Sequence, residues 1–276
     1  MLAAVISIGA AAPPMRIVSL APGVTETLFA LGEGGAVVGV SQYCDYPTAA
    51  TRLPKVGTFL TPNVEAIAAL HPDLIIGPQL SSSRREVRTL AAMGYPTMTV
   101  EDDSLDAIEQ SIVLIGARTG EQDAAHRLLG AIRAHIEEIH TRIERTKPRT
   151  VVMLVGHQPM VAVGPGTFLD DLLHLAGGDN IADLSAQNWP RLSIEYIIAT
   201  RPEVILDGAM GNDANTPSGF WSRYPTIPAV RDRRVFGYPQ DPTLHPGPRV
   251  WQSLELLARR IHPEAFARSD TQGAAR

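Results

Sequence analysis

The chain carries one short pattern in two widely separated places. It reads "NVEAIAALHPDLIIG" over residues 63–77 and "SIEYIIATRPEVILD" over residues 193–207. Each copy opens on a polar residue that can cap a helix. Glu65 or Glu195 follows in the first turn, where the helix dipole favours a negative charge. About two apolar turns then lead to a proline and a β-branched apolar run, a sequence typical of a short helix followed by a buried strand.

A helix, a tight turn and a parallel strand form half of a βαβ unit. Similar alternation continues elsewhere. The sequence predicts strands at 16–20, 36–41 and 96–101, and helices at 25–31 (closed by Gly32), 81–94 and 104–120. It also predicts a helix within 167–182 that ends at a glycine-rich stop, and a closing helix at 247–266. Two copies of the pattern so far apart favour two similar lobes over a short-period solenoid. The predicted fold class is therefore α/β, with two Rossmann-like lobes that have parallel sheets.

The alternation is interrupted by one long amphipathic segment. Residues 121–145 read "EQDAAHRLLGAIRAHIEEIHTRIER", in which the apolar residues form one helical stripe. A single helix of this length is typical of a bridge between lobes. The predicted divisions are a signal remnant or disordered segment (1–14), an N-terminal α/β lobe (15–120), a linker helix (121–146), a C-terminal α/β lobe (147–266) and a disordered tail (267–276).

The composition restricts the possible partners and compartments. Hydrophobic residues make up 45% of the 276 residues and the net charge is −5. Because the chain has no run of lysine and arginine, nucleic acid is not an expected partner. The single cysteine, Cys44, excludes an internal disulfide. Residues 1–14, "MLAAVISIGAAAPP", are apolar and rich in small side chains, as in the hydrophobic part of a secretory signal, and they predict a periplasmic or other extracytoplasmic protein.

Common catalytic motifs are absent from the sequence. It contains no phosphate-binding P-loop, no HExxH zinc motif and no GxSxG elbow. The glycine-rich stretch at 32–39 lies between a predicted helix and a predicted strand, whereas a Rossmann fingerprint lies between a strand and a helix. We therefore predict that the protein is not an enzyme, has no catalytic residues and has no cofactor of its own. An enzyme on a doubly wound α/β fold is the alternative from another class.

Several aromatic side chains lie in predicted loops, although only 5% of the residues are aromatic. Tyr43 follows the strand at 36–41, Phe59 precedes the first copy of the repeat and Trp189 precedes the second. Loops that follow the carboxyl ends of strands line the ligand crevice in open α/β sheets. Aromatic side chains there would suit a large, flat, partly apolar ligand. Packing of each aromatic within its own loop is the simpler alternative.

Four stretches together resemble a known family. They are "RIVSLAPGVTETLFALG", "VVGVSQYCDYP", "LPKVGTFLTPNVEAIAALHPDLIIG" and "HPGPRVWQSLELLARRIHPE". They are similar to the periplasmic cobalamin-binding proteins of ABC importers, which belong to the helical-backbone class that also carries haem and ferric siderophores. The resemblance covers roughly residues 16–264. It implies two lobes joined by one long helix, a corrinoid bound between the lobes, delivery of that ligand to a membrane-embedded permease, and a monomer.

The resemblance also implies roles for individual residues. Family aromatics stand at Tyr43, Phe59 and Trp189, and Val161 occupies a ligand-facing position where the family has a phenylalanine. The chain departs from the family pattern at two further positions. Pro78 stands where the family has an aromatic, and Ala176 stands where some members have a disulfide cysteine.

Glu65 and Glu195 acquire a second interpretation from the resemblance. One glutamate of each lobe docks onto arginines of the two permease subunits in this family, and these two residues occupy the corresponding positions. The duplicated pattern would then be a duplicated docking point, which suits a two-fold symmetric transporter. The alternative is that both acids only stabilise the first turn of their helices.

Two histidines are candidates for metal ligation. His245, in "DPTLHPGP", lies in a late loop, and His157, in "GHQP", follows the first strand of the second lobe. A neutral imidazole nitrogen from either could coordinate cobalt or iron. His245 is the favoured ligand of the two, and a surface or loop-bracing role is the simpler alternative for both. Haem or a ferric siderophore is the alternative ligand within the class that the resemblance implies.

Overall fold

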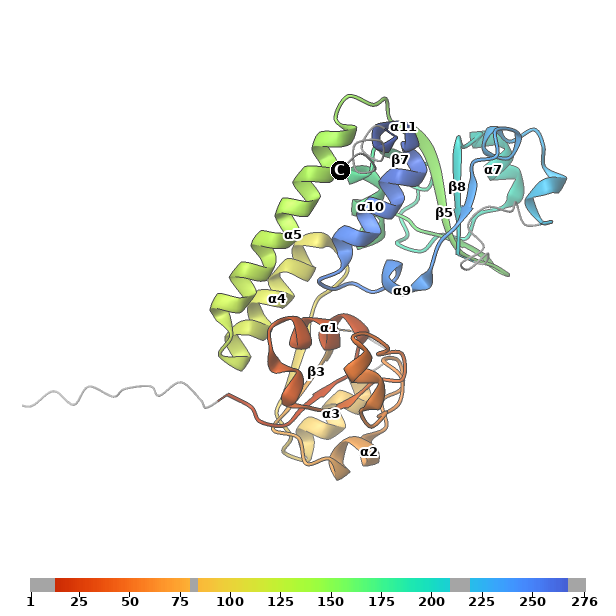
Figure 1. Ribbon diagram of the computed structural model, residues 1–276. Coiled ribbons are helices and arrows are strands. Elements are labelled where there is room, and N and C mark those ends of the chain that lie inside the picture. The colour runs from red at the N-terminus through yellow and green to blue at the C-terminus, as the bar shows by residue number, and fades with distance from the viewer. Residues whose placement is uncertain (1–12, 80–83, 209–218, 268–276) are drawn as a thin grey trace, which may run out of the picture. The chain divides into compact units, whose positions relative to one another are not determined.

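The computed structural model describes residues 13–79, 84–208 and 219–267 (Figure 1). It is an α/β chain that divides into two compact units. The described residues of Met1–Val100 and of Val113–Ala125 belong to unit one. Those of Glu101–Ile112 and of His126–Arg276 belong to unit two. The predicted α/β fold class with parallel sheets is confirmed.

Unit one contains a four-stranded parallel sheet in the order β2-β1-β3-β4. Its strands are β1 (Ile17–Ser19), β2 (Val37–Val40), β3 (Leu74–Pro78) and β4 (Thr97–Val100). Its short helices are α1 (Pro22–Ala30), η1 (Glu33–Gly35), η2 (Thr48–Arg52), α2 (Val64–Ala69) and α3 (Arg84–Ala92). The core of this unit includes Val18, Ile67 and Ile75, which are fully or almost fully buried.

The predicted glycine stop after the first helix is confirmed. Helix α1 begins at Pro22, whose fixed φ and missing N–H suit the first helical turn. Gly32 follows the helix with φ +95°, a conformation that glycine adopts without steric cost. The chain thereby turns out of the helix and enters β2 next to β1.

Two longer helices follow the first sheet, α4 (Leu105–Thr119) and α5 (Gln122–Ile143). The 22 residues of α5 have a length of about 33 Å at 1.5 Å per residue. Leu129, Ile132 and Ile139 of the predicted apolar stripe are buried. Both helices contribute residues to each unit, since the boundaries fall within them. The lobe limits predicted at residues 120 and 146 stay a prediction.

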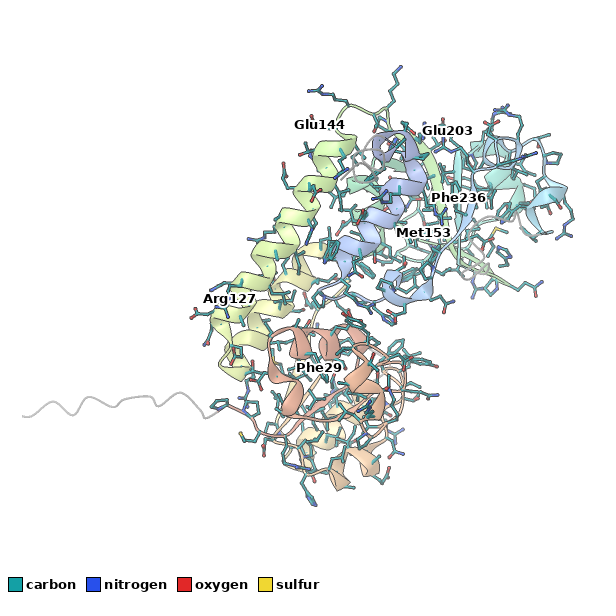
Figure 2. All side chains as sticks on the ribbon, viewed as in Figure 1. Phe29, Arg127, Glu144, Met153, Glu203 and Phe236 are labelled. Carbon is teal, nitrogen blue, oxygen red and sulfur yellow. The ribbon has the colours of Figure 1, made fainter. Side chains whose placement is uncertain are left out.

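Unit two contains a five-stranded sheet with the path β6-β5-β8-β9, and β7 pairs with β5 off this path. Its strands are β5 (Arg149–His157), β6 (Met160–Ala162), β7 (Gly178–Asn180), β8 (Val204–Asp207) and β9 (Val235–Gly237). Its described helices are α6 (Phe168–Leu175), α7 (Ile194–Thr200), η4 (Trp221–Arg223), α8 (Pro228–Arg231), α9 (Gln240–Thr243), α10 (Val250–Ile261) and α11 (Pro263–Phe266). Met153 of β5 is fully buried (Figure 2).

The duplicated sequence pattern forms the same local structure twice. The first copy is α2 followed by β3, and the second is α7 followed by β8. Asn63 accepts a hydrogen bond from the Ala66 amide, and Ser193 accepts one from the Tyr196 amide, so both predicted caps are present. The two copies therefore begin their helices by the same hydrogen bond.

The turn between helix and strand is also duplicated. The residues before the two prolines, His71 and Arg201, have positive φ values of 45° and 52°. Such values are uncommon outside glycine, asparagine and aspartate. The two turns therefore share a strained backbone conformation that the sequence pattern alone does not reveal.

The structure corrects three element predictions. The helix expected within residues 167–182 ends at Leu175 and its predicted glycine stop is present at Gly177, with φ +77°, but the residues after this stop form the unpredicted strand β7. The helix expected over residues 247–266 is broken at His262, whose φ/ψ of −129°/61° is non-helical and precedes Pro263. Strand β6 pairs antiparallel with β5, so the sheet of unit two is not wholly parallel.

No described helix combines the length and the apolar composition that crossing a membrane requires.

Candidate ligand-binding site

Tyr43 lies in a loop that a buried thiol anchors. The Cys44 side chain is fully buried and accepts a hydrogen bond from the Thr25 hydroxyl at 3.1 Å. It also lies 3.1 Å from the Ser41 hydroxyl, and burial raises the pKa of the thiol. With Cys44 held inside, the adjacent Tyr43 points outward and is 48% exposed. The loop directly follows β2, so Tyr43 stands at the carboxyl edge of the first sheet, as predicted from the sequence.

Phe59 is presented by a tight turn in unit one. The turn is closed by the hydroxyls of Thr58 and Thr61, which lie 2.9 Å apart, and by the Thr61 amide, which donates to the Thr58 hydroxyl. Gly57 opens it with φ +92°, and a Cβ there would lie 2.6 Å from the Thr61 carbonyl oxygen. Phe59 makes an edge contact with Tyr43, with ring centroids 6.3 Å apart. Two of the predicted ligand-binding aromatics are thus neighbours.

Trp189 and Val161 lie on adjoining segments of unit two. The segment around Trp189 runs antiparallel to β6, because the Ala162 amide donates to the Pro190 carbonyl and Val161 forms a bridge with Arg191. A Cβ on Gly164 would lie 2.5 Å from the Gln187 carbonyl oxygen, so this close approach requires glycine. Trp189 is 46% exposed and Val161 is half-buried. The structure brings these two predicted residues together.

His157 takes part in a polar cluster that the sequence analysis did not foresee. It ends β5, and its Nε2 lies 2.7 Å from Oδ2 of Asp207, which ends the adjacent parallel strand β8. Asp207 is fully buried and also accepts a hydrogen bond of 2.7 Å from Nε1 of Trp221. The His157 ring stacks on Phe220 with centroids 4.6 Å apart. Carboxyl ends of adjacent parallel strands meet at one edge of a sheet, so the His157–Asp207 pair follows from the pairing of β5 with β8, which the sequence alone does not show.

The same cluster weakens the case for His157 as a metal ligand. A carboxylate accepts hydrogen bonds, so Nε2 of His157 carries the proton that faces Asp207. The nitrogen left for a metal is Nδ1, which lies next to the main chain and is the more hindered of the two. Tyr238 directly follows β9, and burial together with the charge of Asp207 raises the pKa of its hydroxyl. These contacts indicate that His157 and Asp207 hold the sheet edge together.

His245 has the opposite ring orientation. Its Nδ1 lies 3.3 Å from Oδ1 of Asp241 in α9, and Arg249 forms an ion pair with the same carboxylate. This contact leaves Nε2 as the nitrogen that could coordinate a metal. A carboxylate behind one ring nitrogen is the usual support for a histidine that binds metal through the other. The geometry is therefore more compatible with metal ligation at His245 than at His157.

Glu65 and Glu195 are exposed at equivalent positions, each in the first turn of its helix. The pKa of Glu195 is lowered chiefly by a hydrogen bond from its own backbone amide and also by one from Ser193. Neither side chain is buried, so both are sterically available to a partner. Helix-terminus stabilisation and docking both remain compatible with these positions.

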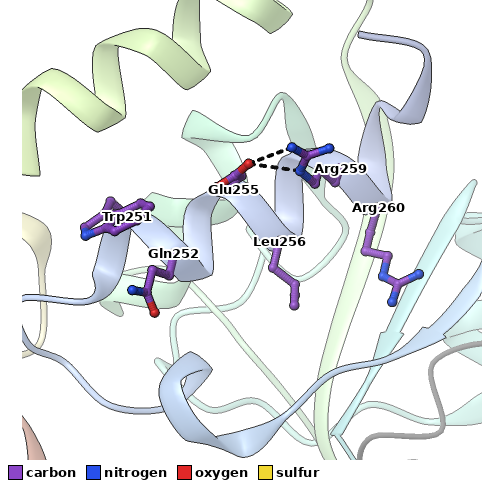
Figure 3. Close-up of a pocket in the computed structure, with 6 residues that line it drawn as sticks. All are labelled: Trp251, Gln252, Glu255, Leu256, Arg259 and Arg260. Atoms are coloured by element: carbon purple, nitrogen blue, oxygen red, sulfur yellow. Dashed lines mark hydrogen bonds and ion pairs between the residues drawn. The ribbon is translucent and has the colours of Figure 1, made fainter. Parts of the chain in front are cut away.

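A surface cavity of unit two contains none of the predicted ligand-binding residues (Figure 3). It has a volume of about 490 Å³ and runs along α10, where its lining is Trp251, Gln252, Glu255, Leu256, Arg259 and Arg260. Trp251 stacks on His135 of α5 with ring centroids 4.1 Å apart. Arg259 pairs with Glu255 within the helix, and Arg260 lies over the ring of Phe236.

The fold and these loops define a class of protein. Two α/β units, each with exposed aromatic side chains in loops near its sheet, are typical of proteins that bind and release a small molecule. The periplasmic binding protein family matches residues 17–242, and the chain belongs to that family. Its members are substrate-binding proteins rather than enzymes.

Individual relatives are named for two kinds of ligand. The chain is 30% identical over 215 residues to a vitamin B12-binding protein of Yersinia pestis (strain Pestoides F), a match that covers 78% of this chain and 77% of the relative. The structure is similar to that of the periplasmic vitamin B12 binding protein BtuF of Vibrio cholerae, with a TM-score of 0.81 and 27% identity over 93% of this chain and 99% of that one. It is similar to the periplasmic heme-binding protein RhuT from Roseiflexus sp. RS-1, with a TM-score of 0.80 and 31% identity over 91% and 98%.

Proposed function

We propose that the protein is the substrate-binding protein of an ABC importer and that it carries a corrinoid of the cobalamin type. The observation that carries the proposal is the set of exposed aromatics, Tyr43 and Trp189 with Phe59 beside Tyr43. Exposure of such rings costs hydrophobic free energy unless a ligand covers them. The relatives named for vitamin B12 support the choice of ligand.

Haem is the second candidate, and one observation favours it. The imidazole of His245, supported by Asp241 on its Nδ1 side, resembles a histidine prepared to ligate iron. The likeness to a heme-binding protein at 31% identity supports the same reading. A ferric siderophore would be recognised mainly through its oxygen donors and gains no specific support from these contacts.

The direct test is titration of the purified protein with cyanocobalamin, hemin and a ferric siderophore, followed by visible absorption and calorimetry. The proposal predicts saturable binding of the corrinoid at one site. Replacement of Trp189 with alanine should weaken it by about 1–3 kcal/mol, the scale of a lost buried aromatic contact. Trp251→Ala is the matched control, because Trp251 lies on α10 outside the predicted site. Haem would be favoured instead if the protein binds hemin in preference to the corrinoid and if His245→Ala shifts the visible spectrum of the bound hemin.

Delivery to a permease completes the proposal. The protein would act as a monomer in the periplasm and dock through Glu65 and Glu195, which lie exposed at the starts of the duplicated helices. Exposed charges of this kind steer association more than they add affinity. If variants of Glu65 and Glu195 bind the ligand and still support normal uptake, the proposed carrier role stands and the docking role of these two residues is wrong.

A further inference from the structure

A second cluster of ligating side chains lies in unit two, apart from every residue proposed to contact the carried ligand. It consists of Asp170 and His174 on α6 and Asp183 in the turn after β7. One side-chain oxygen or nitrogen from each residue lies within 4.8 Å of the others. The cluster combines one imidazole with two carboxylates, so it is more than a group of exposed acids.

Local folding brings the three residues together. Asp170 and His174 are four residues apart and therefore share one face of α6. The helix ends after Leu175, and the chain passes through Gly177 and β7 back towards the same face. The Asp183 amide donates to the Asn180 carbonyl, which closes the turn that presents Asp183.

The buried member of the cluster is held by further contacts. Asp170 is only 5% exposed, and its Oδ1 accepts a hydrogen bond of 2.8 Å from Nδ2 of Asn180. The same amide group donates to the Val163 carbonyl, and Oδ1 of Asn180 accepts from the Ala182 amide. Such secondary contacts fix the orientation of a metal-ligating carboxylate.

The distances fit a small tetrahedral metal site. Nε2 of His174 lies 3.2 Å from Oδ2 of Asp183 and 3.5 Å from Oδ1 of Asp170. Ligands at about 2.0–2.1 Å from a tetrahedral zinc ion are about 3.3–3.4 Å apart. A metal between the three groups would therefore need only small side-chain movements.

The charges also favour a cation. Asp170 and Asp183 bring two carboxylates against the single imidazole of His174. A divalent ion bound between them would neutralise both carboxylates.

We propose that Asp170, His174 and Asp183 form a binding site for a divalent transition metal of the zinc class. One nitrogen and two oxygen donors suit zinc and its neighbours, whereas magnesium and calcium prefer oxygen donors alone. His174 is 47% exposed, so a water molecule can complete the coordination from the solvent side. Metal binding releases the His174 proton when that proton is present. The role is structural, because the metal would tie α6 to the turn after β7.

The test is calorimetric titration of the full chain with zinc chloride after dialysis against a chelator. The wild type should bind one zinc ion at this site and unfold at a higher temperature with zinc present. His174→Ala and Asp183→Asn should each weaken zinc binding at least tenfold and lose the thermal shift. Both residues are largely exposed, so these variants should fold.

Two controls make the result specific. His140→Ala changes another exposed histidine, on α5, and should leave zinc affinity unchanged. Cobalt should give the visible absorption of a tetrahedral nitrogen and oxygen site in the wild type and lose it in His174→Ala, and a large excess of magnesium should not compete. The proposal is overturned if the wild type shows no saturable zinc binding, or if His174→Ala binds zinc as tightly as the wild type. The proposed metal site includes no residue proposed to contact the corrinoid. Titration of the same variants with a corrinoid should therefore give the wild-type affinity.

Discussion

The two sheets differ at a pair of equivalent positions. In the duplicated segments, Gly77 of β3 corresponds to Asp207 of β8. Gly77 packs against Leu20, so closely that an added Cβ would lie 3.1 Å from that side chain. Asp207 instead carries a fully buried carboxylate that accepts hydrogen bonds from His157 and Trp221. The same backbone pattern therefore supports an aliphatic sheet edge in unit one and a polar one in unit two.

The difference begins earlier in each unit. After β1 the chain enters α1 within a few residues, whereas β5 continues into a hairpin with β6 before α6 begins. The hairpin carries His157 to the end of β5, where it reaches the carboxylate of the next strand. Duplication of a scaffold thus leaves the loops at the strand ends free to diverge, which is where α/β proteins bind ligands.

The largest expected effect comes from removing the buried carboxylate. Asp207→Ala should lower the free energy of unfolding by about 3 kcal/mol, because the N–H groups of Trp221 and His157 both lose their acceptor inside the protein. Urea denaturation followed by circular dichroism measures the change. Asp123→Ala, which changes an exposed aspartate on α5, should cost less than about 1 kcal/mol. An equally small cost for Asp207→Ala would show that the polar edge does not stabilise unit two.

A second carboxyl group of unit two, that of Asp102, is expected to lower the stability of the folded protein when it is ionised, in contrast to the carboxylate of Asp207. Burial, with a smaller contribution from the charge of Asp103, raises the pKa of Asp102 from its ordinary value of about 4 to about 6. The folded state therefore holds the proton more tightly than the unfolded state. The stabilisation from this group is greatest below about pH 4 and is lost as the pH rises through about 6.

Replacement of Asp102 with asparagine should remove this pH dependence. At pH 7.5 the unfolding free energy should rise by about 1–3 kcal/mol, since the ionised carboxylate is no longer buried, and at pH 4 it should change little. Asp103→Asn, which removes only the lesser cause, should give a smaller gain at pH 7.5. A parallel decline of the wild type and Asp102→Asn between pH 4 and 7.5 would contradict the assignment.

The two helix caps provide a smaller and more symmetrical test. Asn63→Ala and Ser193→Ala should each lower the unfolding free energy by about 1 kcal/mol, because each removes the acceptor of one helix N–H group. The exchanged variants Asn63→Ser and Ser193→Asn keep a capping oxygen and should be close to the wild type. Unequal losses in the two alanine variants would mean that the duplicated helices contribute differently to their units.

The sequence was sufficient for the fold because its strongest signals are periodic and local. The caps, the paired prolines and the β-branched runs predicted α2, β3, α7 and β8, all of which are present. Strand β1 has only three residues and was predicted, whereas β6 and β7, of the same length, were missed. Strand β7 reads GDN and has no apolar residue, and β6 follows directly after the long apolar run of β5. The glycine-rich stop predicted within residues 167–182 is present at Gly177, and the break at His262 could have been expected from Pro263.

The candidate site was only partly predictable. The positions of Tyr43, Phe59 and Trp189 near strand ends followed from the order of elements, but their exposure depends on anchors such as Cys44 and Gly164. The His157–Asp207 pair joins residues that are 50 positions apart, and no local pattern connects them. Side-chain chemistry across strands requires the sheet order, which a single sequence does not contain.

The smallest effect on stability, and the sharpest test of the duplication, concerns Glu65 and Glu195. Both are exposed, so Glu65→Arg and Glu195→Arg should leave unfolding and corrinoid titration nearly unchanged. If they dock onto permease arginines, each reversal should reduce uptake in cells that lack their own receptor, and the double variant should reduce it further. The defect should depend on ionic strength when transport is reconstituted in vesicles, because exposed charge pairs are screened by salt. Glu203→Arg reverses another acidic side chain in unit two (Figure 2). This control must be checked for folding, since Glu203 accepts a hydrogen bond from the Thr150 amide. Normal uptake by the Glu65→Arg/Glu195→Arg variant would reduce both residues to first-turn acids, and the repeat would then reflect duplication of the fold alone.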